Sequence, residues 1–298
     1  MRQLKEFSQY SVFLIISLFL KLLPGRLAAR FGRKLGLLFY LLDRRHRKVA
    51  IDNLTSAFGS KWSPAEIERV AKNSFENLGE SAVEMIRMEN RSPQEILKAI
   101  SVDGMEHYRE AAGKGRGLVF IGAHFGNWEL LGIGISLLFQ KGFMVARKLD
   151  NAYLHNKLNR FRTFTGNRVI NKNDAFWEMI RLLKKGELVC VLMDQNVARR
   201  EGVFVPFFGR PACTNKGLAM ILLKTKTPML PIFMIRQKNG THRIVVGPEI
   251  PLVQTGHLKN DIRQNTVQIT RAIEEMIRQY PDQWLWMHRR WKTELESS

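Results

Sequence analysis

His124 and Glu129 are the two side chains in this sequence whose types and spacing best suit acid–base chemistry. They lie in the segment GLVFIGAHFGNWELLG, where an apolar run ends at the histidine and a helical pattern begins near the glutamate. The carboxylate could hold one imidazole nitrogen while the other nitrogen takes a proton from an incoming hydroxyl. Because no Ser or Cys nucleophile accompanies the pair, the fitting chemistry is direct attack of a substrate hydroxyl on an activated acyl group. The alternative is a histidine with a purely structural role.

The elements around this pair must bring the two side chains together. Residues five apart on one helix lie roughly 140° apart around its axis, so His124 is expected on a loop and Glu129 on the following helix. Asn127 has the residue type of a helix N-cap and is also a candidate substrate-binding residue. Gly122 and Gly126 would allow close approach of a substrate, and the helix N-terminus would support a developing oxyanion.

Apolar runs and helical patterns alternate through the rest of the chain. Strands are predicted at 117–123, 143–146, 188–193, 229–235 and 243–246, and helices at 128–140, 151–165, 174–185, 215–226 and 259–280. This alternation is typical of an α/β fold in which helices flank a mostly parallel central sheet. Ligands of such sheets bind at the carboxyl ends of the strands, where His124 is placed.

Further candidate binding residues follow other predicted strands. Arg147 ends the strand FMVAR, where a guanidinium could hold a phosphate or an oxyanion. Asp194 and Gln195 end the strand ELVCVLMDQ and are candidates for substrate binding, although an acidic residue at such a place is often only a turn cap. Residues 141–172 hold eight Lys or Arg against the single acidic residue Asp150. That run indicates either a solvated face or a patch for lipid phosphates or an acidic carrier protein.

The N-terminal segment points to a membrane. Residues 8–20 carry no charge, and as a helix they would reach about 20 Å, short of a hydrocarbon core of about 30 Å. A basic amphipathic pattern follows over residues 26–42, and residues 1–50 hold 11 Lys or Arg against 2 acidic residues. We expect residues 1–42 to form membrane-anchoring and amphipathic helices on an anionic membrane, and residues 43–298 to form the α/β domain on its cytoplasmic side. The alternative is two ordinary core helices with solvated basic ends.

Composition narrows the classes of protein to which the chain can belong. With 45% hydrophobic and 25% charged residues, the chain is typical of a globular protein. Two cysteines argue against a disulfide framework, and the histidines show no metal-ligand spacing. Neither a P-loop nor a G-x-G-x-x-G segment follows a strand, so neither a metal nor a nucleotide cofactor is expected. The net charge of +20 favours anionic partners, but no RNA-binding signature accompanies it, so nucleic acid is not expected among them.

Several segments resemble one known family when taken in order. HFGNWE resembles the H-x4-[D/E] motif of the lipid A late acyltransferases and of their bacterial lysophospholipid acyltransferase-like relatives. The similarity continues in DRRHRKVAIDNL (43–54), LLKKGELVCVLMDQN (182–196), GVFVPFFGRPACTNKGLA (202–219), PMLPIFMIR (228–236) and PDQWLWMHRRWK (281–292). Each segment is weak evidence singly, whereas their order is specific.

The resemblance implies an enzyme on the cytoplasmic face of the bacterial inner membrane. Such enzymes move a fatty acyl chain from acyl carrier protein to the 3-hydroxyl of an acyl chain on a glucosamine disaccharide phosphate. It implies His124 as the general base, Glu129 as its partner, and a functional role for Arg162, which precedes a glycine. Two alternatives stay open: the same chemistry on a phosphatidylinositol mannoside, an ornithine-type lipid or a lysophospholipid, and a non-enzymatic basic protein that binds a membrane or nucleic acid.

Overall fold

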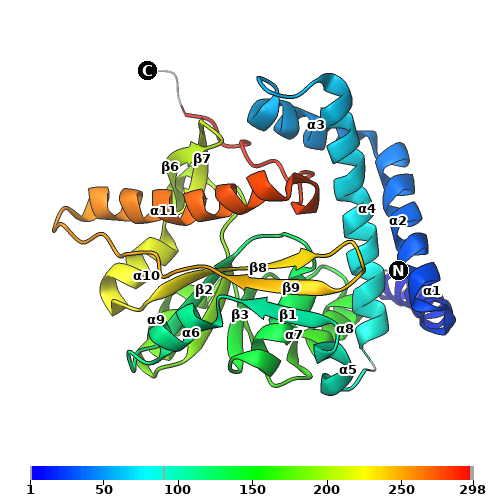
Figure 1. Ribbon diagram of the computed structural model, residues 1–298, viewed down its shortest axis with the longest axis horizontal. Helices are drawn as coiled ribbons and strands as arrows, with labels where there is room; N and C mark the ends of the chain where they lie inside the picture. Colours follow the sequence, from blue (N-terminus) through cyan, green and yellow to red (C-terminus); the bar gives the residue numbers. More distant parts are fainter. Residues whose placement is uncertain (1, 90, 296–298) are drawn as a thin grey trace.

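The N-terminal part of the chain folds into a group of long helices (Figure 1). In the computed structural model, which describes residues 2–89 and 91–295, these are α1 (Arg2–Leu22), α2 (Gly25–Leu42), α3 (Arg44–Phe58) and α4 (Pro64–Met88). The break between α1 and α2 falls at Pro24, which lies directly before the first residue of α2. Helix α4 begins where Ser63 and Glu66 form a capping box and proline occupies the first helical position.

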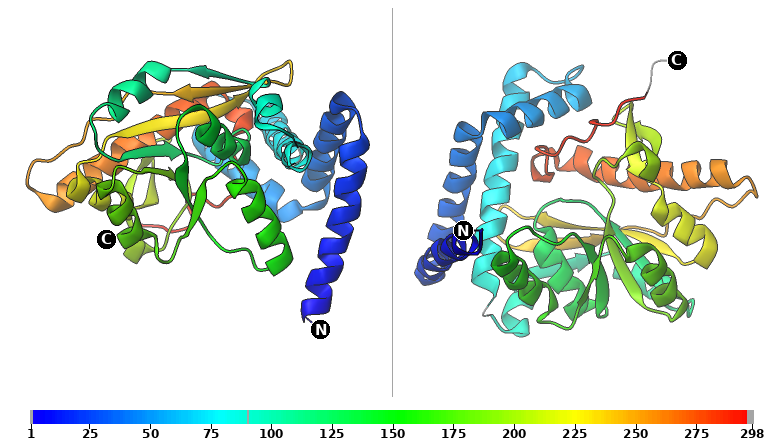
Figure 2. Two further views of the ribbon diagram at one scale, coloured as in Figure 1. Left: turned by 90° about the horizontal axis from the view of Figure 1, so that it is seen from below. Right: turned by 180° about the vertical axis from the view of Figure 1, so that it is seen from behind.

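Helix α2 packs against α4 through glycines. A Cβ atom on Gly36 would lie 2.1 Å from the carbonyl oxygen of Phe75, and one on Gly79 would lie 2.2 Å from the carbonyl oxygen of Gly32. Only glycine allows two helix backbones to approach this closely. Helix α1 lies at the edge of the molecule beside α8 (Ala152–Thr163), where Tyr10 stacks on Tyr153 (Figure 2). No helix of the described residues is long and apolar enough to cross a membrane.

A seven-stranded sheet forms the centre of the remaining chain. Its strands run in the order β1 (Ile100–Asp103), β9 (His242–Val246), β8 (Met229–Arg236), β2 (Leu118–Gly122), β5 (Leu188–Leu192), β3 (Gly142–Ala146) and β4 (Arg168–Asn171). The β8–β9 pair is antiparallel, and every other pair in this sheet is parallel. The predicted α/β fold with a mostly parallel central sheet is therefore confirmed.

Helices cover both faces of this sheet. Residues Val119 and Ile121 of β2 face a core shared with α9 (Ala175–Lys184), α10 (Gly217–Thr225) and α11 (Leu258–Gln279), whereas Leu118 and Phe120 face a core shared with α7 (Trp128–Leu138). Figure 1 shows α7 and α11 on opposite sides of the sheet. The short helices α5 (Pro93–Leu97) and α6 (Met105–Ala112) and the 3₁₀ turns η1 (Arg199–Glu201) and η2 (Pro281–Gln283) complete the helical elements of the described chain.

The strands and helices predicted in this region form within a few residues of their expected bounds. Four strands were not expected: β1, β4 and the antiparallel hairpin of β6 (Gly202–Phe207) and β7 (Arg210–Asn215). β1 and β4 have the sequences ISVD and RVIN, and both lie at sheet edges, where one side lacks a strand neighbour. Such short strands with polar ends lack the apolar run by which the buried strands were predicted.

Candidate active site

Strand register brings His124 and Asp194 together. β2 and β5 are parallel neighbours, and Gly122 lies opposite Leu192 at their carboxyl ends. His124 and Asp194 each lie two residues beyond those ends, so their side chains leave the same edge side by side. Nδ1 of His124 lies 2.9 Å from Oδ1 of Asp194, and the backbone N–H of His124 donates to Oδ2 at 2.9 Å. The carboxylate thus fixes both the ring and the backbone of the histidine.

Asp194 is a buried carboxylate that accepts a hydrogen bond from a third donor, besides the ring and the backbone N–H of His124. Its side chain is 3% exposed, and Oδ2 also accepts a hydrogen bond of 2.8 Å from the indole N–H of Trp284. Burial alone would raise the pKa of Asp194, but the charge and hydrogen bonds of His124 and the bond from Trp284 outweigh it and lower the pKa to about 2. The group is therefore ionised at neutral pH and acts only as an acceptor.

This ionised partner sets the tautomer of His124. An acceptor at Nδ1 keeps the proton on that nitrogen, so Nε2 carries the free lone pair that a general base needs. Burial lowers the pKa of His124, yet the charge and hydrogen bond of Asp194, with a further contribution from the charge of Glu129, raise it above its ordinary value. The ring is about one-fifth exposed, at 21%. Nε2 of His124 lies 3.4 Å from the side-chain nitrogen of Gln195.

Glu129 holds Arg162 rather than the ring of His124. The guanidinium donates to both carboxylate oxygens, through Nε at 2.8 Å and Nη2 at 2.5 Å, and each side chain is 15% exposed. Glu129 lies in the first turn of α7 and Arg162 in the last turn of α8. From the sequence, Glu129 is expected to hold one imidazole nitrogen of His124, whereas in the structure Asp194 holds Nδ1 of that ring. The negative charge of Glu129 still acts on His124, because it helps to raise the pKa of the imidazole.

Asn127 begins α7, as predicted from its residue type. Its Oδ1 accepts the N–H of Leu130 at 3.1 Å, and its Nδ2 donates to Glu84 at 2.8 Å. The side chain is 1% exposed, so it positions the helix and presents no surface to a substrate. Gly126, just before it, has a φ of +55°, and a Cβ there would lie 1.9 Å from the carbonyl oxygen of Met234. Only glycine fits this turn between the strand and the helix.

A cavity of about 510 Å³ opens beside His124. Its polar lining residues include His124, Arg162 and Gln195, together with Arg147 just after β3. Its apolar lining residues include Val145, Phe176, Met179, Val191, Leu218 and Ile221. A base and a guanidinium in a cavity that also has apolar side chains suit a substrate with a reactive carbonyl on a hydrocarbon chain.

The basic run at 141–172 is divided between two roles. Arg162 pairs with Glu129 in the cavity, and Lys157 pairs with Glu89 of the segment that follows α4. Arg147 contributes to the cavity, but its side chain is 78% exposed and lies 3.4 Å from Asp150. The run is therefore neither purely a solvated face nor a single patch.

Sequence reasoning missed two features of this site. Trp284 lies in the segment PDQWLWMHRRWK, and no local pattern marks it as a partner of Asp194, although its side chain is 1% exposed and donates to that carboxylate. Asp194 was expected to bind substrate, whereas its carboxylate is used by His124 and Trp284. The available signal was that both His124 and Asp194 follow buried strands at the same interval.

Comparison with known proteins identifies sequences that this chain resembles. Residues 1–293 match the family described as bacterial lipid A biosynthesis acyltransferase. The chain is 29% identical over 280 residues to the lipid A biosynthesis lauroyltransferase of Escherichia coli (strain K12), covering 92% of this chain and 88% of the relative. It is 27% identical over 273 residues to the lipid A biosynthesis palmitoleoyltransferase of the same organism, covering 91% and 87%. A phosphatidylinositol mannoside acyltransferase of Mycobacterium tuberculosis (strain CDC 1551 / Oshkosh) is 22% identical over 231 residues, 76% of this chain and 71% of the relative.

The fold and these matches define an enzyme that transfers acyl groups. The chain belongs to the family of bacterial lipid A biosynthesis acyltransferases, as the resemblance of its motifs implies. The alternative of a non-enzymatic basic protein is therefore wrong.

Proposed function

We propose that this enzyme transfers a fatty acyl chain from acyl carrier protein to a hydroxyl of a phosphorylated lipid A precursor, with His124 as the general base. One observation carries the proposal: a buried, ionised Asp194 holds Nδ1 of His124, which leaves the lone pair of Nε2 to face a cavity lined by both polar and apolar side chains. The names of the relatives support a lipid A-like acceptor. The basic residues at 141–172 support an acidic carrier as donor.

The reaction balances with the groups present. Nε2 of His124 takes the proton of the acceptor hydroxyl while that oxygen attacks the thioester carbonyl carbon. The new C–O bond gives a tetrahedral oxyanion, and its collapse breaks the C–S bond. The leaving thiolate then takes the proton back from the imidazolium, so the base is regenerated and an ester remains. Asp194 stabilises the imidazolium between these two proton transfers.

Arg162 and Arg147 are the proposed binding groups for negative charge. Glu129 uses Nε and Nη2 of Arg162, which leaves the third guanidinium nitrogen for the developing oxyanion or a substrate phosphate. Glu129 thereby acts in two ways, since it fixes Arg162 and its charge helps to raise the pKa of His124. Arg147, exposed at the mouth, suits a phosphate of the acceptor. Gln195 lies where its amide can donate to the reacting oxygen.

The direct test is an assay with both substrates. Purified protein receives acyl carrier protein loaded with a labelled fatty acid and a tetra-acylated lipid A precursor, and mass spectrometry identifies the product. An added acyl chain on the precursor is the expected result. If no product forms with any acyl chain length from C10 to C18, that result contradicts the proposed acceptor. The mycobacterial relatives favour one second candidate, a phosphatidylinositol mannoside, which is assayed in parallel.

Replacement of Glu129 by glutamine is expected to lower kcat roughly 10- to 100-fold. The substitution removes the charge that holds Arg162 in place and leaves a guanidinium that is 15% exposed without its partner. Steady-state kinetics with both substrates measure the effect. The matched control is Glu178→Gln, which breaks an exposed pair with Arg181 and is expected to leave kcat unchanged. Equal kcat values for parent and Glu129→Gln would refute this role.

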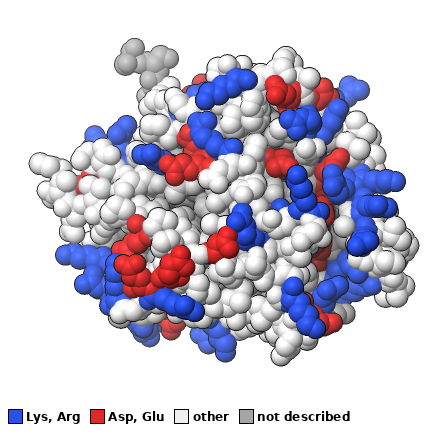
Figure 3. All heavy atoms as spheres, viewed as in Figure 1, with Lys and Arg blue, Asp and Glu red and all other residues white. Residues whose placement is uncertain are grey.

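We also propose that α1 and α2 attach the enzyme to the cytoplasmic face of the bacterial inner membrane. Large apolar side chains are exposed along both helices, among them Ile15 at 70%, Leu18 at 64% and Leu22 at 77%. Figure 3 shows Lys and Arg side chains gathered over α2, with uncharged surface over α1 beside them. Apolar side chains next to basic ones suit the surface of an anionic bilayer.

The variant Ile15→Gln/Leu18→Gln/Leu22→Gln is expected to lose vesicle binding by at least about tenfold. Each exposed side chain that inserts contributes on the order of 1 kcal/mol or more, and 1.4 kcal/mol corresponds to a factor of ten. Co-sedimentation with phosphatidylethanolamine–phosphatidylglycerol vesicles measures the partition coefficient. Leu258→Gln, which changes a side chain 62% exposed on α11, is the control and should bind as the parent does. Unchanged binding of the triple variant would refute the proposed surface.

A further inference from the structure

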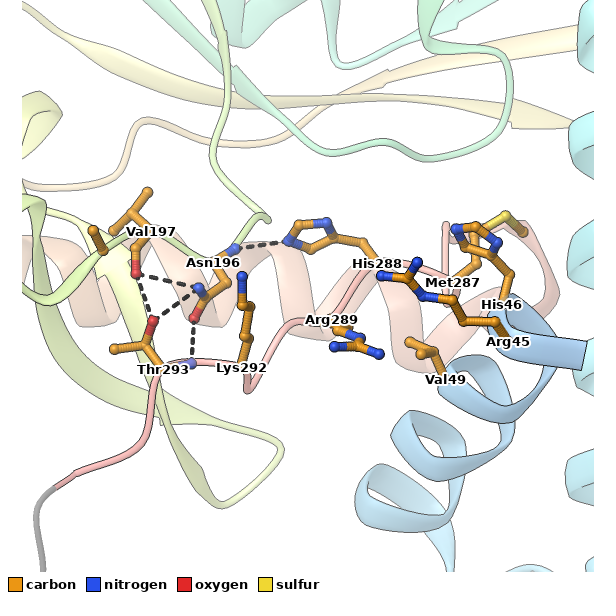
Figure 4. A pocket seen from close by; sticks show the side chains of 11 residues that line it. Arg45, His46, Val49, Asn196, Val197, Met287, His288, Arg289, Lys292 and Thr293 are labelled. Carbon is orange, nitrogen blue, oxygen red and sulfur yellow. Dashed lines mark hydrogen bonds between the residues drawn. The ribbon is translucent and has the colours of Figure 1, made fainter.

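A second cavity, of about 560 Å³, lies next to the active site and is lined by basic side chains. Three segments form its walls: the start of α3, the loop after β5, and the C-terminal segment 287–293 (Figure 4). The five basic residues among its lining residues are Arg45, His46, His288, Arg289 and Lys292, and no Asp or Glu lines it. We call it the basic cavity.

Three of these side chains are cations without a carboxylate partner. Arg45, Arg289 and Lys292 are exposed residues, and none has an ion pair among the described residues. His46 differs, because its Nδ1 lies 2.7 Å from Asp43. Three cations without a carboxylate partner around one hollow give it a positive potential, which favours binding of an anion.

Hydrogen bonds join the three walls, so the cavity is preformed. Asn53 of α3 donates to the carbonyl oxygens of Trp286 at 2.7 Å and His288 at 2.8 Å. The backbone N–H of Asn196 donates to Nε2 of His288 at 3.0 Å, and its side chain bonds with Thr293. A site held in shape before binding spends less free energy on ordering when a ligand arrives.

The loop after β5 connects this cavity to the reaction centre. Asn196 and Val197 line both the basic cavity and the cavity beside His124. Asp194 precedes this shared wall by two residues. A ligand bound by the three cations can therefore extend along the wall to the cavity where Nε2 of His124 is free.

We propose that the basic cavity binds a phosphoryl group of one substrate and thereby sets the position of that substrate against His124. This inference rests on the proposed function for the identity of the substrate. The phosphoryl group has two possible sources: a phosphate on the glycolipid acceptor, or the phosphodiester of the pantetheine arm of the carrier. Arginine and lysine donate several charge-assisted hydrogen bonds to either group.

The first experiment needs no catalysis, so it remains informative if the proposed function fails. Inorganic phosphate is titrated into the full-length protein by isothermal calorimetry at low salt. The variant Arg45→Gln/Arg289→Gln/Lys292→Gln is expected to raise the dissociation constant roughly tenfold or more. The matched control Arg109→Gln/Arg263→Gln/Lys259→Gln removes three exposed cations outside this cavity and should bind as the parent does. Equal phosphate binding by the site variant and the parent would overturn the proposal.

The second experiment distinguishes the two sources. KM is measured for the acceptor with and without its phosphates, and for acyl carrier protein against an acyl-pantetheine that lacks phosphate. A site variant that raises KM only for the phosphorylated acceptor assigns the cavity to the acceptor, and one that raises KM only for the carrier assigns it to the donor arm. Unchanged KM for both substrates would contradict a role in catalysis, while the titration separately decides whether the cavity binds phosphate.

Discussion

Replacement of His124 by alanine is expected to lower kcat about a thousandfold while KM for either substrate changes little. Nε2 of His124 is the imidazole nitrogen that faces this cavity among the described residues, and the Gln195 side-chain nitrogen lies 3.4 Å from it. Without Nε2 the acceptor hydroxyl must lose its proton to water. We expect the acyl chain to bind along the apolar side chains of the cavity, which the substitution leaves intact.

The measurement compares transfer rates of parent and variant with acyl carrier protein and the lipid A precursor. His257→Ala is the matched control, because His257 is exposed at the start of α11 and makes no side-chain cap. A thermal unfolding curve shows whether His124→Ala is folded. If the folded variant transfers acyl chains at a rate within tenfold of the parent, His124 is not the base.

The proposed base also predicts the pH dependence of the parent enzyme. In this mechanism the base acts as neutral imidazole, so activity is expected to fall as the pH decreases through the pKa of His124. Because Asp194 and Glu129 raise that pKa in the free enzyme, the acidic limb of the kcat/KM profile is expected above 6.5, the ordinary value for histidine. A profile measured from pH 5 to pH 9 locates this limb.

Much of the fold that positions the candidate site could be predicted from the sequence. The strand GLVFIGA stands out because every residue of β2 is buried, and an uninterrupted apolar run is its signature. The turn after it was predictable from Gly126 and Asn127, whose residue types suit a tight turn and a cap. These are local features, and local features are what a single sequence records.

The partner of His124 could not be chosen from the sequence. Glu129 is five residues away and Asp194 is seventy, so proximity along the chain favours the wrong carboxylate for Nδ1. The choice depends on β5 lying next to β2, and strand order results from how the whole sheet packs. Trp284 was missed for the same reason, since it reaches Asp194 only because the C-terminal segment pairs with Phe125.

Replacement of Asp194 by asparagine is expected to lower kcat roughly 10²- to 10³-fold, although Asp194 itself need not touch substrate. An amide side chain can donate its N–H to Nδ1, which would leave the proton on Nε2 and remove the base. The fraction of histidine in the other tautomer keeps some activity, so the variant remains measurable.

The pH profile of this variant separates a positioning role from a merely structural one. Once the negative charge is gone, burial lowers the pKa of His124 with less opposition, so the acidic limb of kcat/KM is expected at lower pH than in the parent. Asp194 has an ordinary value of 3.8 and a folded pKa of about 2, so its contribution to the free energy of unfolding is present above about pH 4 and is lost as the pH falls toward 2. The control Trp284→Phe removes one donor to the carboxylate and retains the charge, and we expect it to leave the acidic limb near that of the parent. A limb that stays at the parental pH in Asp194→Asn would mean that another group sets the pKa of the base.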